Sequence, residues 1–544
     1  MILLVAASIF ALASPGEEAG HDHGPQIGKV AFDTTCNATA KAHFQRGLAW
    51  LHSFEYQRAE RGFADAAAAD PACGIAYWGV AASYYHPLWA APTPDEYKKA
   101  TAALAKAREV GARSQRENDY IAALGAFYDG GDRIDHKTRV LAYEAALDRL
   151  HQRFPNDREA AVFHALSLIA AGTLDSDPEY GRERKAAALL NDVLKQEPDH
   201  PGVSHYLIHG FDYPALADLA LPAARRYATI APDSAHAQHM PSHIFTRLGL
   251  WDEAVSSNRA AEAAAKSWAK SSGMVGVWDQ QLHAMDYLAY AYLQTGRDAD
   301  AERVFAELKA IGQGVPPTPT AAYAATAIPA RVLLERRQWS KAAASDLPAG
   351  IMGLEAVSKY KWSEANLRFA KAVGAARSGN AAAAREEVAS LQKIEASIPV
   401  RPGEYDWGKQ VSIERQIAEA WLALAEGRKE EAVRIMRGAA DLDDATEKHP
   451  VTPGAVLPAR EQLGELLLEL GRPSEALAEY EASLKRAPKR LGGLYGAARS
   501  ARLAGDSAKA GRYFAELKDV TKGGDGTRAE VKEARAFEAE TAAR

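Results

Sequence analysis

A short motif that recurs along this chain constrains its fold more than any other feature of the sequence. In each copy a glycine is followed five residues later by an alanine, and apolar residues then recur at helical spacing. Glycine can end a helix in a left-handed cap, and a small alanine lets the next helix approach the first closely. The motif therefore predicts helical hairpins. Its copies are GLWDEAV (249–255), GRDADAERVF (296–305), GNAAAAREEV (379–388), GRKEEAVRIM (427–436), GRPSEALAEYEASLKRAP (471–488) and GDSAKAGRYF (505–514).

The spacing of the copies identifies the kind of hairpin. Gly471 and Gly505 are 34 residues apart, as are Pro198 and Pro232. The pattern resembles the tetratricopeptide repeat (TPR), a helix-turn-helix unit of 34 residues, and it is similar to exported bacterial members of that family. The resemblance covers most of residues 38–520. It implies an all-α, right-handed superhelical solenoid of about ten helix pairs, with a concave groove that binds a peptide or protein.

The same pattern suggests a division of the chain into five parts. Residues 1–24 are expected to be a signal peptide and a linker that contains histidine, and residues 33–310 an N-terminal TPR-like array. A proline-rich break follows at 311–322, where AIGQGVPPTPTAAY interrupts the repeats. Residues 323–520 are expected to form a C-terminal array, and 521–544 a charged tail or capping helix.

Composition excludes some classes of function. The net charge is −6 and no basic stripe stands out, so we expect no nucleic-acid partner. The first residues, MILLVAASIFALAS, contain an apolar run as long as that of a secretory signal. The run is too short to span a bilayer. No basic residue precedes it. No later segment is long and apolar enough for a membrane span. From the signal-like start we expect an exported protein, periplasmic or extracellular.

The chain has two cysteines, Cys36 and Cys73. They flank one predicted helix pair, one before its first helix and the other after its second. In an oxidising compartment such a pair favours a disulfide, which would close the N-terminal unit.

Histidines gather in three consecutive predicted first helices. Positions i, i+3, i+4 and i+7 share one face of a helix. Residues 205–212, 236–243 and 283–290 follow that spacing, while apolar residues at other positions supply the packing between helices. Each helix therefore carries a polar stripe. The stripes are His205, His209 and Asp212; His236, His239 and His243; and His283, Asp286 and Tyr290.

Neighbouring helices pack roughly 8–10 Å apart, so the three stripes are expected to converge on one pocket. In the family that the sequence resembles, the corresponding positions line the concave groove. Histidine is the commonest metal ligand, and imidazole-rich sites suit zinc and copper. The metal-ligand candidates are His205, His209, His239, His243 and His283, and further ligand-binding candidates are Asp212, His236, Asp286 and Tyr290.

Pro241 complicates the second stripe. A proline inside a helix removes a backbone hydrogen bond, so it predicts a kink or a late helix start. If the helix starts at Pro241, His236 and His239 lie on the approach to it, and only His243 keeps its helical place.

Two other segments bear on the pocket. EKHPVTPGAVLPAREQLGE (447–465) holds His449, Glu461 and Glu465, and the two glutamates are further ligand-binding candidates. If the superhelix completes a turn, this segment can close the histidine pocket; otherwise it forms an exposed acidic groove. YYHPLW (84–89) is interpreted as a loop closure with an aromatic plug.

Three functions remain open at this stage. The leading hypothesis is a binding scaffold whose groove holds a peptide, protein or small ligand, with a histidine-rich pocket that can take a divalent metal. The alternative is a zinc- or copper-dependent enzyme at the same histidines, with Asp212 or Asp286 as base or as an orienting group. In a purely structural adaptor the histidines would be incidental. No known catalytic signature decides between them, so enzymatic activity is left open.

Overall fold

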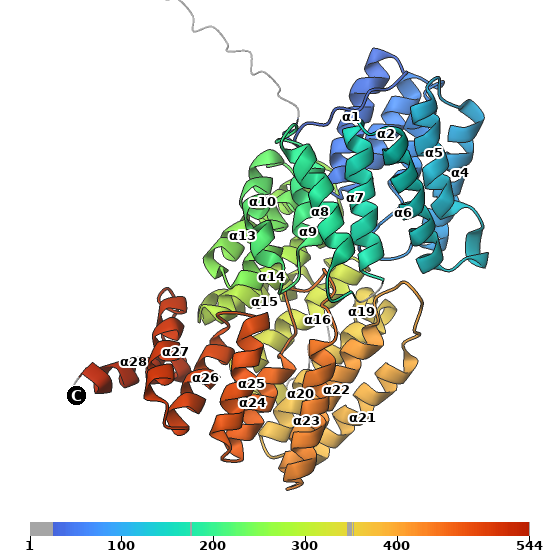
Figure 1. Cartoon of the computed structure of the whole chain (residues 1–544). Helices are drawn as coiled ribbons and strands as arrows, with labels where there is room; N and C mark the ends of the chain where they lie inside the picture. The colour runs from blue at the N-terminus through green and yellow to red at the C-terminus, as the bar shows by residue number, and fades with distance from the viewer. Residues whose placement is uncertain (1–24, 175–176, 345–350, 352, 543–544) are drawn as a thin grey trace, which may run out of the picture.

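Consecutive helices joined by tight turns make up the chain in the computed structural model, which describes residues 25–174, 177–344, 351 and 353–542. The expected signal peptide and histidine-containing linker at 1–24 lie outside the described residues. No strand occurs in the part of the chain that the structure describes, and the expected all-α solenoid of TPR-like hairpins is confirmed (Figure 1). Short 3₁₀ turns lie at Gly131–Arg133, Gly312–Gly314 and Lys361–Ser363.

The first half of the array runs from α1 to α15. Its helices are α1 (Ala38–His52), α2 (Tyr56–Ala69), α3 (Gly74–Ala82), α4 (Pro94–Val110), α5 (Gln115–Tyr128), α6 (His136–Arg153), α7 (Arg158–Gly172), α8 (Gly181–Leu194), α9 (Pro201–Gly210), α10 (Ala217–Ile230), α11 (Ala235–His239), α12 (Pro241–Leu248), α13 (Trp251–Ser271), α14 (Asp279–Gln294) and α15 (Asp298–Ile311).

The second half follows the proline-rich stretch. Its helices are α16 (Pro319–Leu334), α17 (Trp339–Ala344), α19 (Glu355–Lys359), α20 (Glu364–Arg377), α21 (Ala381–Ser397), α22 (Trp407–Ala425), α23 (Lys429–Asp444), α24 (Ala459–Glu469), α25 (Pro473–Arg486), α26 (Leu491–Leu503), α27 (Ser507–Val520) and α28 (Ala529–Ala542).

The glycine–alanine motif acts as its chemistry predicts. Each of its glycines has a positive φ, between 65° and 87°, and so lies in the left-handed region that suits a residue without a side chain. Each alanine five residues later is 0% exposed, because it packs where the second helix crosses the first. The glycines are Gly249, Gly296, Gly379, Gly427, Gly471 and Gly505; the alanines are Ala254, Ala301, Ala384, Ala432, Ala476 and Ala510.

Pro241 has the effect expected of a proline at that place. It is the first residue of α12, where its missing N–H needs no partner, and α11 ends two residues earlier at His239. His236 and His239 therefore lie on the short α11, and His243 lies on α12.

The hydrophobic interior contains two large cores, one in each half of the chain. One core extends from Ile27 to Leu367 and a second from Ala330 to Ala534. Residues between 330 and 367 contribute to both cores, so the cores meet after the proline-rich stretch at 311–322 and not within it. That stretch holds the short turn Gly312–Gly314 and then leads into α16.

The last helices return to the turns of the first half, beside α13–α15 (Figure 1). Trp251 Nε1 donates a hydrogen bond to the carbonyl of Lys489 at 2.8 Å. Arg528 pairs with Asp298 at 2.6 Å, across 230 residues of sequence. The C-terminal end of the solenoid is therefore fastened to its middle.

Cys36 and Cys73 form a disulfide, with their Cα atoms 5.2 Å apart, and this confirms the predicted bridge. It closes a loop over a sequence separation of 37 residues, joining Cys36, two residues before α1, to Cys73, the residue before α3. Replacing both cysteines with serine is expected to lower the free energy of unfolding by about 2–4 kcal/mol, because the unfolded chain gains loop entropy. Chemical denaturation with and without reductant measures this. Reductant should leave the serine variant unchanged, and equal stability of the two proteins would contradict the prediction.

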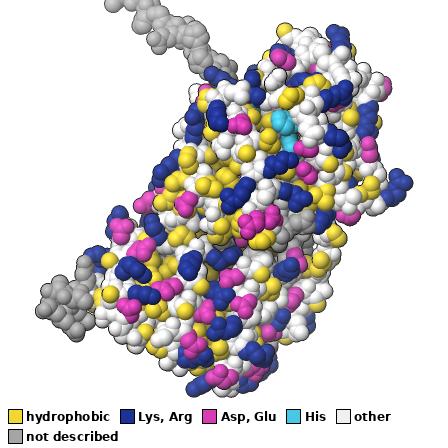
Figure 2. Space-filling view, in the orientation of Figure 1, with side chains coloured by type: hydrophobic (Ala, Val, Ile, Leu, Met, Phe, Trp, Pro, Cys, Tyr) yellow, Lys and Arg dark blue, Asp and Glu magenta, His cyan; other side chains and the backbone are white. Residues whose placement is uncertain are grey.

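The surface is mixed in charge. Lys and Arg side chains lie among Asp and Glu side chains over the face shown in Figure 2, and little histidine is visible there. Among the described helices, none is both long and apolar enough to cross a membrane.

Candidate metal centre

Six histidines from four helices meet in the interior of the first half. α9 supplies His205 and His209, and the two parts of the helix that Pro241 divides supply the next three. α14 supplies His283. We expected the three stripes to converge on one pocket, at positions that line the concave groove in the resembled family. The rings do come together, but each of the six side chains is only 0–5% exposed, so they lie in the interior and not on a groove surface. They form a buried cluster made of two groups: the first triad is His205, His209 and His236, and the second triad is His239, His243 and His283.

In each triad the three ligand atoms lie within 4.8 Å of one another. In the first, His205 Nε2 is 3.1 Å from His236 Nε2. In the second, His239 Nε2 is 3.1 Å from His243 Nε2. Two nitrogens bound to one tetrahedral ion at about 2.0 Å would be about 3.3 Å apart. Both triads are therefore close to the size that a single ion requires.

Hydrogen-bond acceptors fix two rings of the second triad through their Nδ1 atoms. His243 Nδ1 lies 2.8 Å from the Asp212 carboxylate, and His239 Nδ1 lies 2.7 Å from Asn258 Oδ1. The Asn258 amide is fixed in that orientation, because its Nδ2 donates to the carbonyl of Ala254 at 2.8 Å. Both rings must therefore carry their proton on Nδ1, and both Nε2 atoms present a lone pair.

Two lone pairs facing each other at 3.1 Å repel unless a cation lies between them. A proton would turn one ring into an imidazolium, but burial and the neighbouring rings lower the pKa of His239 well below its usual value. Burial also lowers the pKa of His243, although Asp212 acts in the opposite direction. Neutral imidazole is the form that binds metals.

The first triad has a comparable but looser arrangement. His205 Nδ1 donates to the carbonyl of His52 at 2.6 Å, which leaves its Nε2 as an acceptor. His236 Nδ1 lies 3.4 Å from Gln280 Oε1, a longer contact that fixes the ring less firmly. Burial lowers the pKa of His236 to about 3. The first triad is thus also neutral near pH 7.

The remaining ring of each triad, His209 in the first and His283 in the second, has at least one ring nitrogen without a hydrogen-bond partner among the described residues. His209 Nε2 has no hydrogen-bond partner among the described residues, and neither ring nitrogen of His283 has one. An unpartnered buried polar group costs roughly 1–3 kcal/mol, so such groups are rare in proteins. A bound ion would satisfy these nitrogens.

Three aromatic side chains enclose the two triads. The Phe54 ring packs on all three rings of the first triad, with centroids 4.4–5.8 Å apart. Tyr287 does the same for the second triad at 4.6–5.3 Å. Trp89 lies against both, 5.9 Å from His236 and 6.2 Å from His283. The expected aromatic plug at 84–89 therefore belongs to the histidine cluster itself.

The triads are direct neighbours. The ring centroids of His209 and His243 are 5.7 Å apart, and those of His236 and His239 are 6.2 Å apart. Distances within the triads span a similar range, from 4.1 to 6.3 Å. Two ions bound here would share one enclosed space.

Asp212 connects the second triad to a distant part of the chain. Besides His243, it accepts hydrogen bonds from Arg247 and from Lys448, both at 2.8 Å. Burial alone would raise the pKa of Asp212, but Lys448 and Arg247 hold it well below its usual value. The carboxylate therefore stays ionised and orients the His243 ring.

Residues 445–458, which we call the closing segment, cover the cluster between α23 and α24. Beside Lys448, His449 Nε2 lies 3.3 Å from the carbonyl of Trp89. Tyr287 donates to the carbonyl of Thr452 at 3.1 Å, and Arg331 donates to the carbonyl of Gly454 at 2.7 Å. In Figure 1 the segment reaches toward α14 and α16. Of the two alternatives for this part of the chain, these contacts agree with closure of the histidine pocket and not with an exposed acidic groove.

The other predicted ligand-binding residues lie elsewhere in the interior and have protein partners. Asp286 pairs with Arg331 at 3.2 Å, and burial raises its pKa to about 6. Tyr290 accepts a hydrogen bond from Arg490 at 2.8 Å. The two glutamates do not form an exposed acidic groove, because Arg490 and Arg337 cover their carboxylates. Glu461 pairs with Arg490, and Glu465 with Arg337, both at 2.7 Å.

A third cluster, His52, Glu159 and His200, was missed by the sequence analysis. Both histidines contact the Glu159 carboxylate, at 2.9 and 3.1 Å, and His52 also contacts the Tyr206 hydroxyl at 2.9 Å. Its members come from α1, α7 and the residue before α9, so no local spacing could reveal it. Its hydrogen bonds are largely satisfied, and the carbonyl of His52 supports the first triad.

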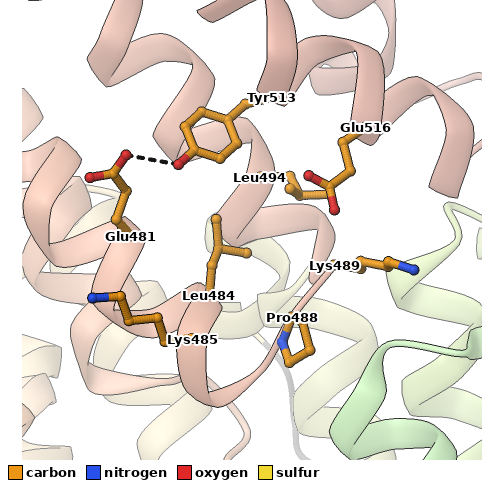
Figure 3. A pocket seen from close by; sticks show the side chains of 8 residues that line it. All are labelled: Glu481, Leu484, Lys485, Pro488, Lys489, Leu494, Tyr513 and Glu516. Atoms are coloured by element: carbon orange, nitrogen blue, oxygen red, sulfur yellow. Dashed lines mark hydrogen bonds between the residues drawn. The ribbon is translucent and has the colours of Figure 1, made fainter. Parts of the chain in front are cut away.

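A surface cavity of about 440 Å³ lies between α25, α26 and α27 (Figure 3). Its lining includes Lys485 and Lys489, and Tyr513 donates a hydrogen bond to Glu481 at 2.8 Å. None of its lining residues belongs to the histidine clusters.

No protein-family model matches the sequence, and no curated protein matches it. Among solved structures, a human IFIT1 dimer with m7Gppp-AAAA is similar with a TM-score of 0.40 and 14% identity, over 82% of this chain and 90% of that chain. The P58(IPK) TPR domain is similar with a TM-score of 0.22 and 14% identity, over 86% of this chain and 99% of that chain. At this level of similarity, the assignment of the fold rests on the helices of this chain.

Proposed function

We propose that the protein binds two transition-metal ions, one in each histidine triad. The observation that carries this proposal is the 3.1 Å contact between His239 Nε2 and His243 Nε2, each of whose rings is fixed with its proton on Nδ1. A metal ion removes the repulsion between these lone pairs. It also satisfies the bare nitrogens of His283.

The donor set fits zinc or copper. Both metals bind imidazole well, and three histidines leave a position open for water or another small ligand. A bound ion would supply a Lewis acid or, for copper, an electron carrier. Asp212 is expected to orient His243 rather than act as a base, because its oxygens already accept from His243, Arg247 and Lys448.

The open coordination position supports the enzyme alternative more than the groove scaffold. The histidines are buried, so their role in anchoring a peptide in the groove receives no support from their position. Export remains part of the proposal. The Cys36–Cys73 disulfide supports it, since disulfides persist in oxidising compartments.

Metal content tests the proposal directly. The purified protein, saturated with zinc or copper and then desalted, is expected to retain two ions per chain by elemental analysis, because there are two triads. His239→Ala should reduce the content to one ion. His164→Ala removes a buried histidine outside the triads and serves as the matched control, with two ions expected. A wild-type protein that retains neither metal would refute the proposal.

Asp212→Asn is expected to weaken the affinity of the second triad about 10–100-fold, because a neutral amide orients the His243 ring less strongly than a carboxylate does. Competition with a chelator of known affinity measures this. Asp286→Asn is the matched control, since that buried carboxyl pairs with Arg331. Equal losses in the two variants would show that Asp212 has no special role.

A further inference from the structure

The charge around the two triads restricts the ions that they can hold together. All six first ligands are neutral imidazoles, so two divalent ions would bring four positive charges into a buried site. Burying charge without compensation is costly. The carboxylate that contacts the His243 ring, Asp212, is already matched by Arg247 and Lys448. Asp286 on α14 is matched by Arg331.

Copper can meet this restriction without an added anion, whereas two zinc ions would need one. Two copper(I) ions bring half the charge of two zinc(II) ions, and copper(I) accepts three imidazole ligands without a further anion. If copper is oxidised in this site, a small bridging anion is needed to balance the added charge. The charge pattern therefore favours a copper pair with a dianion between the ions in its oxidised state.

Burial restricts that bridging ligand to a very small one. The rings are 0–5% exposed and lie behind Phe54, Tyr287 and the closing segment. A peptide or sugar cannot approach them without displacing these groups. Dioxygen can, because it is diatomic and uncharged.

We propose, resting on the function proposed above, that the two triads form one dinuclear copper centre that binds dioxygen as peroxide between the ions. Each copper(I) gives one electron, and dioxygen takes both to become peroxide. Two copper–oxygen bonds form, the O–O bond order falls from two to one, and no proton moves. The total charge of the two ions and the bridge stays at two positive units. Dioxygen is thus the oxidant that leaves the charge of this buried site unchanged.

The test uses the full chain loaded with copper(I) under anaerobic conditions, followed by exposure to dioxygen. We expect two copper ions per chain and a colourless reduced form. Dioxygen should then produce peroxide-to-copper charge-transfer absorption, with no electron paramagnetic resonance signal because the two copper(II) spins couple. Uptake should be one dioxygen per copper pair.

Single-triad variants show whether the pair acts as a unit. His209→Ala and His283→Ala, confirmed to be folded by circular dichroism, should each hold one copper and lose the charge-transfer absorption. Their oxidised copper should give the resonance signal of an isolated ion. His164→Ala is the control and should behave like the wild type. A single-triad variant that keeps the full absorption would overturn the dinuclear centre.

The two proposals fail in different ways. Two bound copper ions that give uncoupled copper(II) signals and no charge-transfer absorption would overturn dioxygen binding and leave two metal sites. Retention of two zinc ions per chain without any copper(I) binding would also overturn dioxygen binding, and it would leave the two metal sites in place. A chain that binds neither metal would overturn both.

Discussion

Lowering the pH from about 7 to about 5 is expected to remove most of the stability of the metal-free protein, because its buried histidines cannot accept protons without unfolding. In an unfolded chain, histidine titrates near pH 6.5. In the folded protein, burial lowers the pKa of all six triad histidines, that of His236 to about 3. Below pH ~6.5 the unfolded state therefore binds more protons than the folded state. Each such group lowers the free energy of unfolding by up to about 1.4 kcal/mol per pH unit.

Some buried carboxyl groups act in the opposite direction. Burial raises the pKa of Asp286 and Asp443 to about 6, of Glu55 to about 7 and of Glu414 to about 8. The folded state takes up these protons first, so acid stabilises it through these groups. The histidines outnumber them. Five histidines outside the triads also have lowered pKa values: His52, His86, His136, His164 and His449.

The expected net loss in the free energy of unfolding between pH 7 and pH 5 is comparable with the whole free energy of unfolding of a typical protein, about 5–15 kcal/mol. Denaturant titrations at several pH values, followed by far-ultraviolet circular dichroism, measure it. A His205→Gln/His236→Gln variant, which removes two of the groups, should show a smaller dependence on pH. Stability that is constant over this range would contradict the expectation. Added metal should move the loss to lower pH, because protons then compete with the ion.

Arg490→Ala is expected to destabilise the protein by about 3–5 kcal/mol, because it leaves charged groups buried without their partner. Arg490 is 0% exposed and lies 2.7 Å from both Glu335 and Glu461, and 2.8 Å from the Tyr290 hydroxyl. It joins α14, the end of α16, α24 and the start of α26. Its removal therefore weakens the contact between the two halves of the array.

Urea denaturation of Arg490→Ala measures this loss. Arg472→Ala is the matched control, because Arg472 pairs with Glu475 near the surface and such pairs contribute about 0–1 kcal/mol. Adding Glu335→Gln and Glu461→Gln to Arg490→Ala should restore part of the stability, since no unpaired carboxylate then remains. A loss no greater than that of the control would refute the interpretation.

Features that depend on local chemistry could be predicted from the sequence. The left-handed glycines, the buried alanines and the helix start at Pro241 each follow from the backbone preferences of one residue. The disulfide followed from its place on either side of one hairpin. The histidine spacing likewise placed the rings on neighbouring helices, although Pro241 divides the second predicted helix into α11 and α12.

The environment of those faces could not be predicted, because distant segments create it. Helical spacing shows which residues share a face, but it does not show what covers that face. Here Trp89 covers the rings from a loop more than 100 residues before α9, and Lys448 from a segment more than 230 residues after it. The same limit explains Glu461 and Glu465, whose arginine partners lie on other helices.

The fastening of Arg528 to Asp298 has a consequence for how this protein can evolve. An open repeat protein can gain or lose whole units, since each unit touches only its neighbours. Here an added or deleted hairpin between α15 and α28 would carry the guanidinium away from its carboxylate. Gain or loss of a repeat between these helices would therefore cost the buried Arg528–Asp298 pair, which substitutions within the existing units leave intact.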